Sequence, residues 1–388
     1  LQAVKAVKQN YRPTEEILSL LEDFRCMVND CVRIGLKENL TSMKSLSMKA
    51  YHQLSAYDAP TYYRLTAISR AAGILRNYRK ELKRNRSARV PYVTRLSLTD
   101  CYGFRVIHRL VRLPVRKGEY VFIVLNDHTL RTMSGRTPRS LTLTANGLSI
   151  CLSKETAEIE PVGAIGIDRN LDNVTTADSD GSILRHDLGR ATEVKARSRE
   201  TKRHFKRNDV RIRRVVYGKY GRIQRNRVAW LLHNVSASIV KRAKEKRFGI
   251  VMENIEGIRR LYRKGNGQGT TYRARLNSWS FYELQRQIEY KARWEGVPVS
   301  YVAARGTSVN CSICGSRTTK YPNGRRTLHC PRCDISIDRD VNAARNILAK
   351  GGVRFTPDGP PEVCTEAMKG NETTTPILRV DGGKVTPG

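Results

Sequence analysis

Long hydrophobic runs are missing from this sequence, which has no apolar stretch of about 18 residues and nothing with the make-up of a signal peptide. A helix that crosses a bilayer needs about 20 apolar residues, so we expect no membrane span and no membrane partner. Regularly paired cysteines are missing too, because the nine cysteines are odd in number and irregularly spaced. This usage favours a reducing compartment over a disulfide framework, so we expect a cytoplasmic protein.

Acidic residues are scarce beside basic ones. The 388 residues include 71 Lys and Arg but 36 Asp and Glu, which gives a formal net charge of +35. Such a surplus attracts polyanions and predicts a nucleic-acid partner; the alternative is a highly basic structural or ribosome-associated protein. With 39% hydrophobic residues the chain can still bury a core, as one large domain or as a few smaller ones.

The positive charge is concentrated in two runs. Segment 195–227 holds fourteen Lys or Arg and two acids, and segment 76–89 holds seven Lys or Arg. A charge run is often only a solvated helix face, but two dense runs in so basic a chain favour contact with nucleic acid. The candidate nucleic-acid-binding residues are Arg76, Arg79, Lys80, Lys83, Arg84, Lys202, Arg203, Lys206, Arg207, Arg211, Arg213 and Arg214.

Four of the cysteines have the spacing of a metal site. Cys311-Ser-Ile-Cys314 and Cys330-Pro-Arg-Cys333 are separated by fifteen residues. Each C-x2-C turn can direct two sulfurs at one tetrahedral ion, which predicts one bound Zn²⁺. Four thiolates leave no position for water, so this zinc is expected to be structural.

Three acids occupy positions suited to metal chemistry. Asp168 and Glu253 each end an apolar strand pattern, and Asp340 lies at the start of a helical pattern, with spacings of 85 and 87 residues. A lone Asp after a strand is more often a turn former than a ligand, so the prediction depends on all three together. Asp338 competes with Asp340; we favour Asp338 as the helix N-cap and Asp340 as the ligand.

Carboxylates are the ligands that Mg²⁺ and Mn²⁺ prefer, and two such ions about 4 Å apart can hold the attacking and leaving oxygens of a phosphodiester. The order of strand, hairpin, helix, strand and helix around the acids suits a mixed sheet flanked by helices, as in the RNase H-like fold. Arg339, beside the acids, is a candidate phosphate contact, with a surface salt bridge as the alternative. The sequence thus indicates a metal-dependent enzyme that acts on nucleic acid.

The N-terminal part changes character near residue 90. Apolar residues recur at helical spacing over 15–82, whereas 90–152 is rich in β-branched residues and turns. Asn146-Gly147 between alternating segments predicts a hairpin. We expect a small β-barrel or sandwich that strand 1–12 completes, with the helices inserted between.

Several segments together resemble the TnpB family, the RNA-guided nucleases of bacterial and archaeal insertion sequences, which are related to the type V CRISPR effectors. The resemblance is detailed over about 160–350, where it includes the three split RuvC motifs, and it covers only the layout of the N-terminal half. The segments that carry it are Gly166–Leu171, Met252–Ile255, Leu276–Gln285, Arg305–Ser308 and Asp338–Ile347.

The resemblance implies an α/β multidomain protein. It predicts an RNase H-like (RuvC) nuclease domain over 161–350 with an inserted zinc ribbon at 305–337. It also predicts a wedge β-barrel formed by 1–12 and 90–160, with a helical recognition domain at 13–89 inserted. Residues 351–388, rich in Pro, Gly and Thr and nearly neutral, are expected to be disordered.

The resemblance also implies an activity. Family members bind a guide RNA from the transposon end, recognise a short motif in double-stranded target DNA, and cut DNA in a single RuvC site. On this basis Asp168, Glu253 and Asp340 are the catalytic ligands of Mg²⁺ or Mn²⁺, two ions being expected, and the protein is associated with the nucleoid of a prokaryote when it is bound to DNA. The four cysteines carry over as a complete zinc site.

Three other functions remain open. A compact type V CRISPR effector would share the chemistry and differ in the origin of its guide. A non-catalytic, zinc-containing nucleic-acid-binding protein would use the acids structurally, which the intact trio disfavours. A DNA-joining transposase is the weakest alternative, because no nucleophilic Tyr beside a His-x-His pair is present.

Overall fold

The computed structural model describes residues 2–85, 87–205, 208–262, 265, 267–320, 326–354 and 362–363. They fold as two compact units, Gln2–Lys154 and the residues from Glu155 onward. Within the described residues no helix is long and apolar enough to cross a membrane. The segment predicted to be disordered, 351–388, lies outside the described residues apart from 351–354 and 362–363. The domain bounds expected from the sequence stay predictions.

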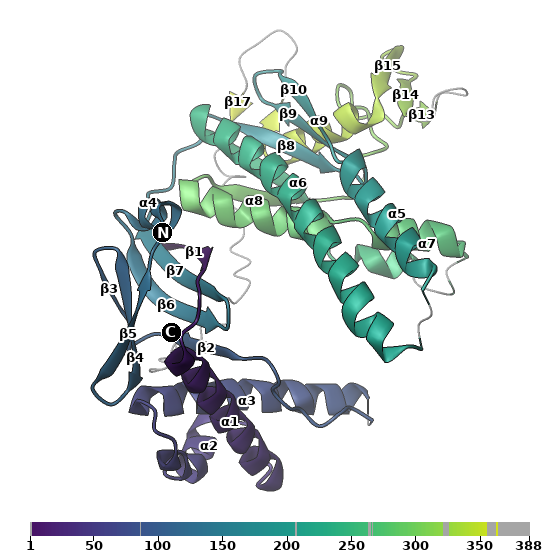
Figure 1. Cartoon of the computed structure of the whole chain (residues 1–388). Coiled ribbons are helices and arrows are strands. Elements are labelled where there is room, and N and C mark those ends of the chain that lie inside the picture. Colours follow the sequence, from purple (N-terminus) through teal and green to yellow (C-terminus); the bar gives the residue numbers. More distant parts are fainter. Residues whose placement is uncertain are drawn as a thin grey trace. The chain divides into compact units, whose positions relative to one another are not determined.

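The first unit contains the predicted helices (Figure 1). Helix α1 begins after Thr14, whose side chain accepts a hydrogen bond from the backbone N–H of Ile17. Its buried residues recur every three or four positions, so one apolar stripe faces the unit's core, as the sequence predicted. The helices of this unit are α1 (Glu15–Lys37), α2 (Met43–Ala50), the 3₁₀ turn η1 (Gln53–Ala56), α3 (Thr61–Arg84) and α4 (Asp127–Met133).

The strands of the first unit form two sheets. In the four-stranded sheet the order is β1-β7-β6-β2, so the first strand of the chain pairs with the last strand of the unit, as expected. The predicted hairpin is confirmed, since Thr144 pairs with Gly147 across a two-residue turn. Closure into a wedge β-barrel stays a prediction. The strands are β1 (Gln2–Asn10), β2 (Ser97–Asp100), β6 (Thr137–Thr144) and β7 (Gly147–Glu155), with β3 (Arg105–Ile107), β4 (Leu110–Arg116) and β5 (Glu119–Val124) in the second sheet.

A five-stranded mixed sheet forms the centre of the second unit. Its order is β10-β9-β8-β11-β12, with β8, β11 and β12 parallel and β9 and β10 antiparallel to their neighbours. Every residue of β8 and β9 is buried, including the polar residues Asp168 and Arg169 of β8 and Asn173 and Asp178 of β9, so neither strand has a solvated face. The strands are β8 (Gly163–Arg169), β9 (Asn173–Asp178), β10 (Ile183–Asp187), β11 (Phe248–Asn254) and β12 (Val299–Ala303).

Helices cover both faces of this sheet (Figure 1). Because side chains alternate along a strand, Ile165 and Ile167 pack with the helices α6 and α8, whereas Ala164 faces α9.

The helical segments are α5 (Gly189–Arg203), the π-helical turn η2 (Ile212–Tyr217), α6 (Gly218–Glu245), the 3₁₀ turn η3 (Ile258–Tyr262), α7 (Thr270–Asn277), α8 (Phe281–Glu295) and α9 (Arg339–Lys350). The short strands are β13 (Thr319–Lys320), β14 (Thr327–Cys330), β15 (Ile335–Asp338), β16 (Val353–Arg354) and β17 (Glu362–Val363).

Gly166 allows α9 to lie directly against β8. A Cβ atom at this position would be 2.4 Å from the carbonyl oxygen of Ala344 and 2.8 Å from the backbone nitrogen of Leu348. Both obstacles are backbone atoms, so a side-chain rotation cannot relieve the clash. The glycine therefore sets how close α9, with Asp340 in its first turn, approaches the sheet.

We predict that Gly166→Ala displaces α9 and lowers the free energy that holds it on the sheet by about 1–3 kcal/mol, the usual cost of overpacking. Hydrogen exchange of the α9 backbone amides measures this opening. The matched control is Gly218→Ala in α6, where a Cβ atom meets nothing within 4 Å. Unchanged protection of α9 in Gly166→Ala would contradict this account of the contact.

Candidate functional site

The three predicted acids lie at one end of the central sheet. Ile167 of β8 pairs with Met252 of the parallel strand β11. The residues that follow, Asp168 and Glu253, are therefore neighbours at the carboxyl ends of these two strands. Asp340 reaches these strand ends from the first turn of α9, and its side chain is only 1% exposed. Asp168 is also buried, with 7% of its surface exposed. The fold thus gathers residues separated by 172 positions in the sequence.

Two asparagines connect Asp168 to Asp340. The Nδ2 group of Asn170 donates to Oδ2 of Asp168 at 2.6 Å and to Oδ1 of Asn173 at 3.4 Å. The Nδ2 group of Asn173 in turn donates to Oδ2 of Asp340 at 3.2 Å. The amides fix the orientation of both carboxylates without adding a charge. Sequence reasoning missed both asparagines, although Asn170 lies inside the segment Gly166–Leu171.

Glu253 is held from two sides. Its Oε1 atom accepts a hydrogen bond from Oγ1 of Thr307, a buried residue that follows β12. Its backbone carbonyl accepts a hydrogen bond from Arg169, whose other Nη atom donates to Oε1 of Gln285 at 2.8 Å. Thr307 belongs to the segment Arg305–Ser308, and its hydrogen bond to Glu253 holds this segment near the acids.

Arginines surround Asp340. Nη1 of Arg326 lies 2.9 Å from Oδ2, Nη2 of Arg185 lies 3.6 Å from the same oxygen, and Nη2 of Arg339 lies 3.5 Å from Oδ1. The salt bridge considered for Arg339 is therefore formed, with Asp340 itself. Arg326 and Arg185 could not be predicted, because neither belongs to a motif and their proximity to Asp340 depends on how β14 and β10 are placed.

Asp338 caps helix α9. Its Oδ1 atom accepts hydrogen bonds from the backbone N–H groups of Asp340 at 2.9 Å and Val341 at 3.1 Å. It also accepts one from Arg185 at 2.8 Å. The expected N-cap is thus confirmed, and the cap satisfies amides that a helix start leaves without partners. The role of Asp340 as a metal ligand stays a prediction.

The acids influence one another electrostatically. Burial raises the pKa of Asp168 to about 7, and the negative charges of Glu253 and then Asp340 act in the same direction, against the hydrogen bond from Asn170. Burial and repulsion both disfavour the ionised form, so a positive charge among the acids would be strongly stabilised. The donor set consists of carboxylate oxygens, the ligand type that a hard divalent cation prefers. Among the described residues only the four cysteines have ligand atoms that all lie within 4.8 Å of one another, so the three carboxylates would have to move closer together to share an ion.

The four predicted cysteines form a compact group. Their Sγ atoms all lie within 4.8 Å of one another, with 3.5 Å between Cys314 and Cys330 and 4.0 Å between Cys311 and Cys333. A tetrahedral site with Zn–S bonds of about 2.3 Å needs sulfurs about 3.8 Å apart, so the group fits one zinc ion. Each cysteine pair is followed by a residue in the left-handed region, Gly315 at φ 74° and Asp334 at φ 53°. This conformation reverses the direction of the chain directly after the pair.

Helix α9 also holds the first cysteine turn. Oδ1 of Asn342 accepts from the backbone N–H of Ser312 at 2.8 Å, and its Nδ2 donates to the carbonyl of Asn310 at 2.7 Å. Asn346, one turn later, donates to the same carbonyl at 2.7 Å. Helix α9 therefore contributes Asp340 to the acids and Asn342 and Asn346 to the support of the first cysteine turn.

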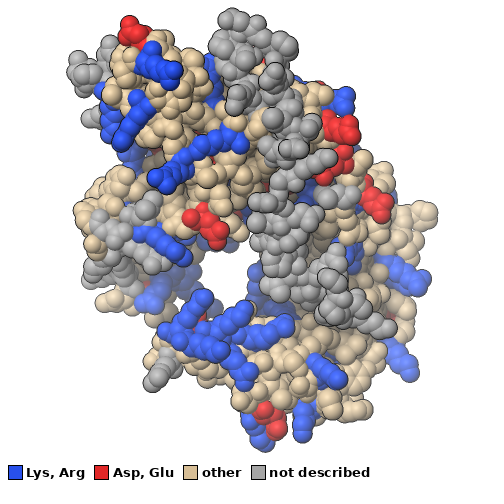
Figure 2. Space-filling view, turned by 180° about the vertical axis from the view of Figure 1, so that it is seen from behind, with Lys and Arg blue, Asp and Glu red and all other residues tan. Residues whose placement is uncertain are grey.

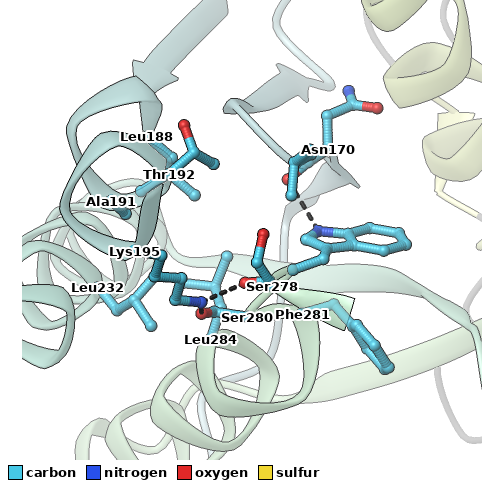
Figure 3. A pocket seen from close by; sticks show the side chains of 12 residues that line it. Asn170, Leu188, Ala191, Thr192, Lys195, Leu232, Ser278, Ser280, Phe281 and Leu284 are labelled. Carbon is cyan, nitrogen blue, oxygen red and sulfur yellow. Dashed lines mark hydrogen bonds between the residues drawn. The ribbon is translucent and has the colours of Figure 1, made fainter. Parts of the chain in front are cut away.

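A small pocket lies beside Asn170, two residues after Asp168 in the sequence (Figure 3). Within it, Nζ of Lys195 donates to the carbonyl of Ser278 and to Oγ of Ser280, and burial lowers the pKa of this lysine to about 8. Nε1 of Trp279 donates to the carbonyl of Asn170 at 2.9 Å. These bonds fix the segment Leu276–Gln285 against the end of β8, so Trp279 positions Asn170, which binds Asp168.

The predicted nucleic-acid-binding residues lie in both units. Five are exposed near the end of α3, where Arg79 donates to Oδ1 of Asn39 at 2.7 Å. Four of the others are exposed and Lys202 is half-buried, whereas Lys206 and Arg207 lie outside the described residues. Figure 2 shows Lys and Arg outnumbering Asp and Glu on the face it presents. Contact with nucleic acid stays a prediction for all of them.

Comparison with known proteins places the chain in a family. Residues 281–347 match the family model described as Cas12f1-like, TNB domain. A TnpB-like protein of Methanocaldococcus jannaschii, MJ0751, is 34% identical over 192 residues, which are 47% of this chain and 67% of that protein. A candidate RNA-guided DNA endonuclease of Streptomyces pristinaespiralis is 28% identical over 207 residues, 52% of this chain and 48% of that protein.

A solved structure is similar in fold. The Cas12f1–sgRNA–target DNA complex contains a chain that aligns with a TM-score of 0.56 at 16% identity, covering 86% of this chain and 82% of the other. The match to the Streptomyces protein spans about half of that relative's length. The match to the Methanocaldococcus protein extends over two thirds of it, and on this identity the chain belongs to the TnpB-like family.

Proposed function

We propose that this protein is an RNA-guided DNA endonuclease of TnpB type that cuts its target in a single RuvC-like site. The observation that carries the proposal is the meeting of Asp168, Glu253 and Asp340 at one end of the mixed sheet, where burial and like charge raise the pKa of Asp168. The similarity to TnpB-like proteins and the Cas12f1-like fold support the same function.

In the proposed site Asp168, Glu253 and Asp340 would hold Mg²⁺ or Mn²⁺, two ions being expected, which would supply positive charge to activate water and stabilise the leaving oxygen. Asn170 and Asn173 keep the carboxylates oriented through their hydrogen bonds. Thr307 does the same for Glu253. The arginines that contact Asp340 are partly exposed, so their remaining N–H groups are available to bind a phosphate of the substrate.

The partners are a guide RNA from the transposon end and double-stranded target DNA with a short adjacent motif. The exposed basic residues at the end of α3 and around η2 supply positive charge for the backbone of a heteroduplex, which such proteins recognise by shape. A compact CRISPR effector is the second candidate, favoured by the Cas12f1-like match. The origin of the bound RNA separates the two: a transposon end in one case and a CRISPR repeat in the other.

The function is tested by expressing the protein with its native flanking DNA, sequencing the RNA that co-purifies, and adding a DNA target complementary to it. Wild type is expected to cut, and Asp168→Ala to cut at least about 100-fold more slowly, since even partners of metal ligands contribute 10–100-fold. The same RNA should co-purify with the variant, because Asp168 is only 7% exposed and the substitution removes no basic residue. Cutting at the wild-type rate by Asp168→Ala would refute the site.

The choice between the two aspartates of α9 has its own test. Asp340→Asn is expected to abolish guided cutting, because it removes a buried charge from the site. Asp338→Asn is the matched control: asparagine caps a helix as well as aspartate, so cutting should stay within about threefold of wild type. Cleavage rates of the two variants decide the matter. If Asp338→Asn loses activity and Asp340→Asn keeps it, the assignment is reversed.

We propose that the cysteines bind one structural zinc ion. Cys330→Ser should lose the zinc and lower the thermal midpoint of the second unit by about 5–10 °C, since structural zinc contributes directly to folding. Zinc content by mass spectrometry and calorimetry measure the two effects. Cys101→Ser, at an exposed cysteine of the first unit, is the control and should change neither. Purified wild type without zinc would contradict the assignment.

A further inference from the structure

An open hollow lies near the acids and shares Asn170 and Leu171 with the small pocket. It has a volume of about 310 Å³, within the range of ligand sites. Its lining includes a basic pair, Arg326 and Arg339, and an apolar pair on α7, Tyr272 and Leu276. None of the motifs identified in the sequence includes Tyr272.

The basic wall suits a phosphate next to the acids. Arg326 and Arg339 both contact the carboxylate of Asp340, and their side chains are still 46% and 43% exposed. Their remaining N–H groups can therefore bind a second anion that enters the hollow. Arg275 and Asp172, which also line the hollow, form an ion pair at 2.8 Å and together add no net charge. The hollow thus has a net positive charge at the end nearest Asp340.

The other wall suits a nucleobase. Tyr272 is 54% exposed on the surface of α7, and Leu276 lies four residues later, hence on the same side of the helix. A tyrosine ring beside an aliphatic side chain gives a flat apolar surface that can stack on a base of any type. A base within a duplex has both faces covered by its neighbours, so only an unpaired nucleotide can use this surface.

We infer that the hollow holds one unpaired nucleotide of the DNA strand that is being cut, with its base on Tyr272 and its phosphate on Arg326 and Arg339. This rests on the proposed function, since it names the substrate of the same site. Tyr272 is then a substrate-positioning residue, which holds the strand so that the adjacent phosphodiester reaches the three acids.

Stacking is tested directly with 2-aminopurine, whose fluorescence is quenched by a stacked ring. RNA-loaded Asp168→Ala protein, which does not cut, is bound to complementary DNA carrying one 2-aminopurine that is moved stepwise through the cut region. Quenching at one position should depend on Tyr272: Tyr272→Ala should raise the fluorescence there, while Tyr272→Phe should not. Tyr282→Ala is the matched control, since Tyr282 is 63% exposed on α8 and does not line the hollow. Equal fluorescence in Tyr272→Ala and its parent at every position would overturn the inference.

Cleavage gives the second readout. An abasic site at the quenched position should slow wild type about 10-fold, a typical effect of losing one stacked base, and should not slow Tyr272→Ala further. Equal cutting of both substrates by both proteins overturns the inference and leaves the proposed function standing. A wild type that cuts no complementary DNA overturns the proposed function instead, so the two failures are distinct.

Discussion

The backbone contact between helix α9 and strand β8 is the constraint on which the site depends. It exists because Gly166 has no side chain where the carbonyl of Ala344 and the backbone of Leu348 approach. The contact places the first turn of α9 against the strand ends, so Asp340 reaches the edge where Asp168 and Glu253 lie. Since Asn342 and Asn346 of the same helix bind the first cysteine turn, the contact fixes the cysteine group as well.

Placing three acids at one end of the sheet costs electrostatic free energy, which contacts within the same unit partly offset. The charged form of Asp168 is disfavoured by burial and by its acidic neighbours. The hydrogen bond from Asn170 and the positive charge of Arg339 lower the pKa of Asp168 and offset part of this, while Thr307 bonds Glu253 and Arg326 pairs with Asp340. Unfavourable electrostatic interactions of this kind, with a strongly shifted pKa, are typical of catalytic centres.

The sequence predicted the elements well, because their signals are local. The apolar stripe of α1 follows from helical periodicity, the hairpin before Gly147 from a turn signal, and the buried strands around Ile165 and Ile250 from short apolar runs. The cysteine group was also predictable, since its spacing alone brings the sulfurs together.

The contacts around the acids could not be predicted in the same way. Arg185, Arg326 and Thr307 lie on separate elements, and only the folded sheet brings them to Asp340 and Glu253. Trp279 was noticed as part of a motif, but its bond to the carbonyl of Asn170 requires α8 and β8 to be placed first. Tyr272 had no signal at all, because an exposed tyrosine on a short helix is ordinary in a sequence.

The most direct test of this account is to locate manganese by anomalous diffraction in crystals of the protein grown with Mn²⁺. The account predicts manganese at the edge of the sheet with oxygen ligands from Asp168, Glu253 and Asp340, and none bound to Asp338, which is occupied as the cap. Manganese bound to Asp338, or absent from this edge while Asp340 keeps its arginine partners, would contradict the central claim that the α9–β8 contact builds a metal site.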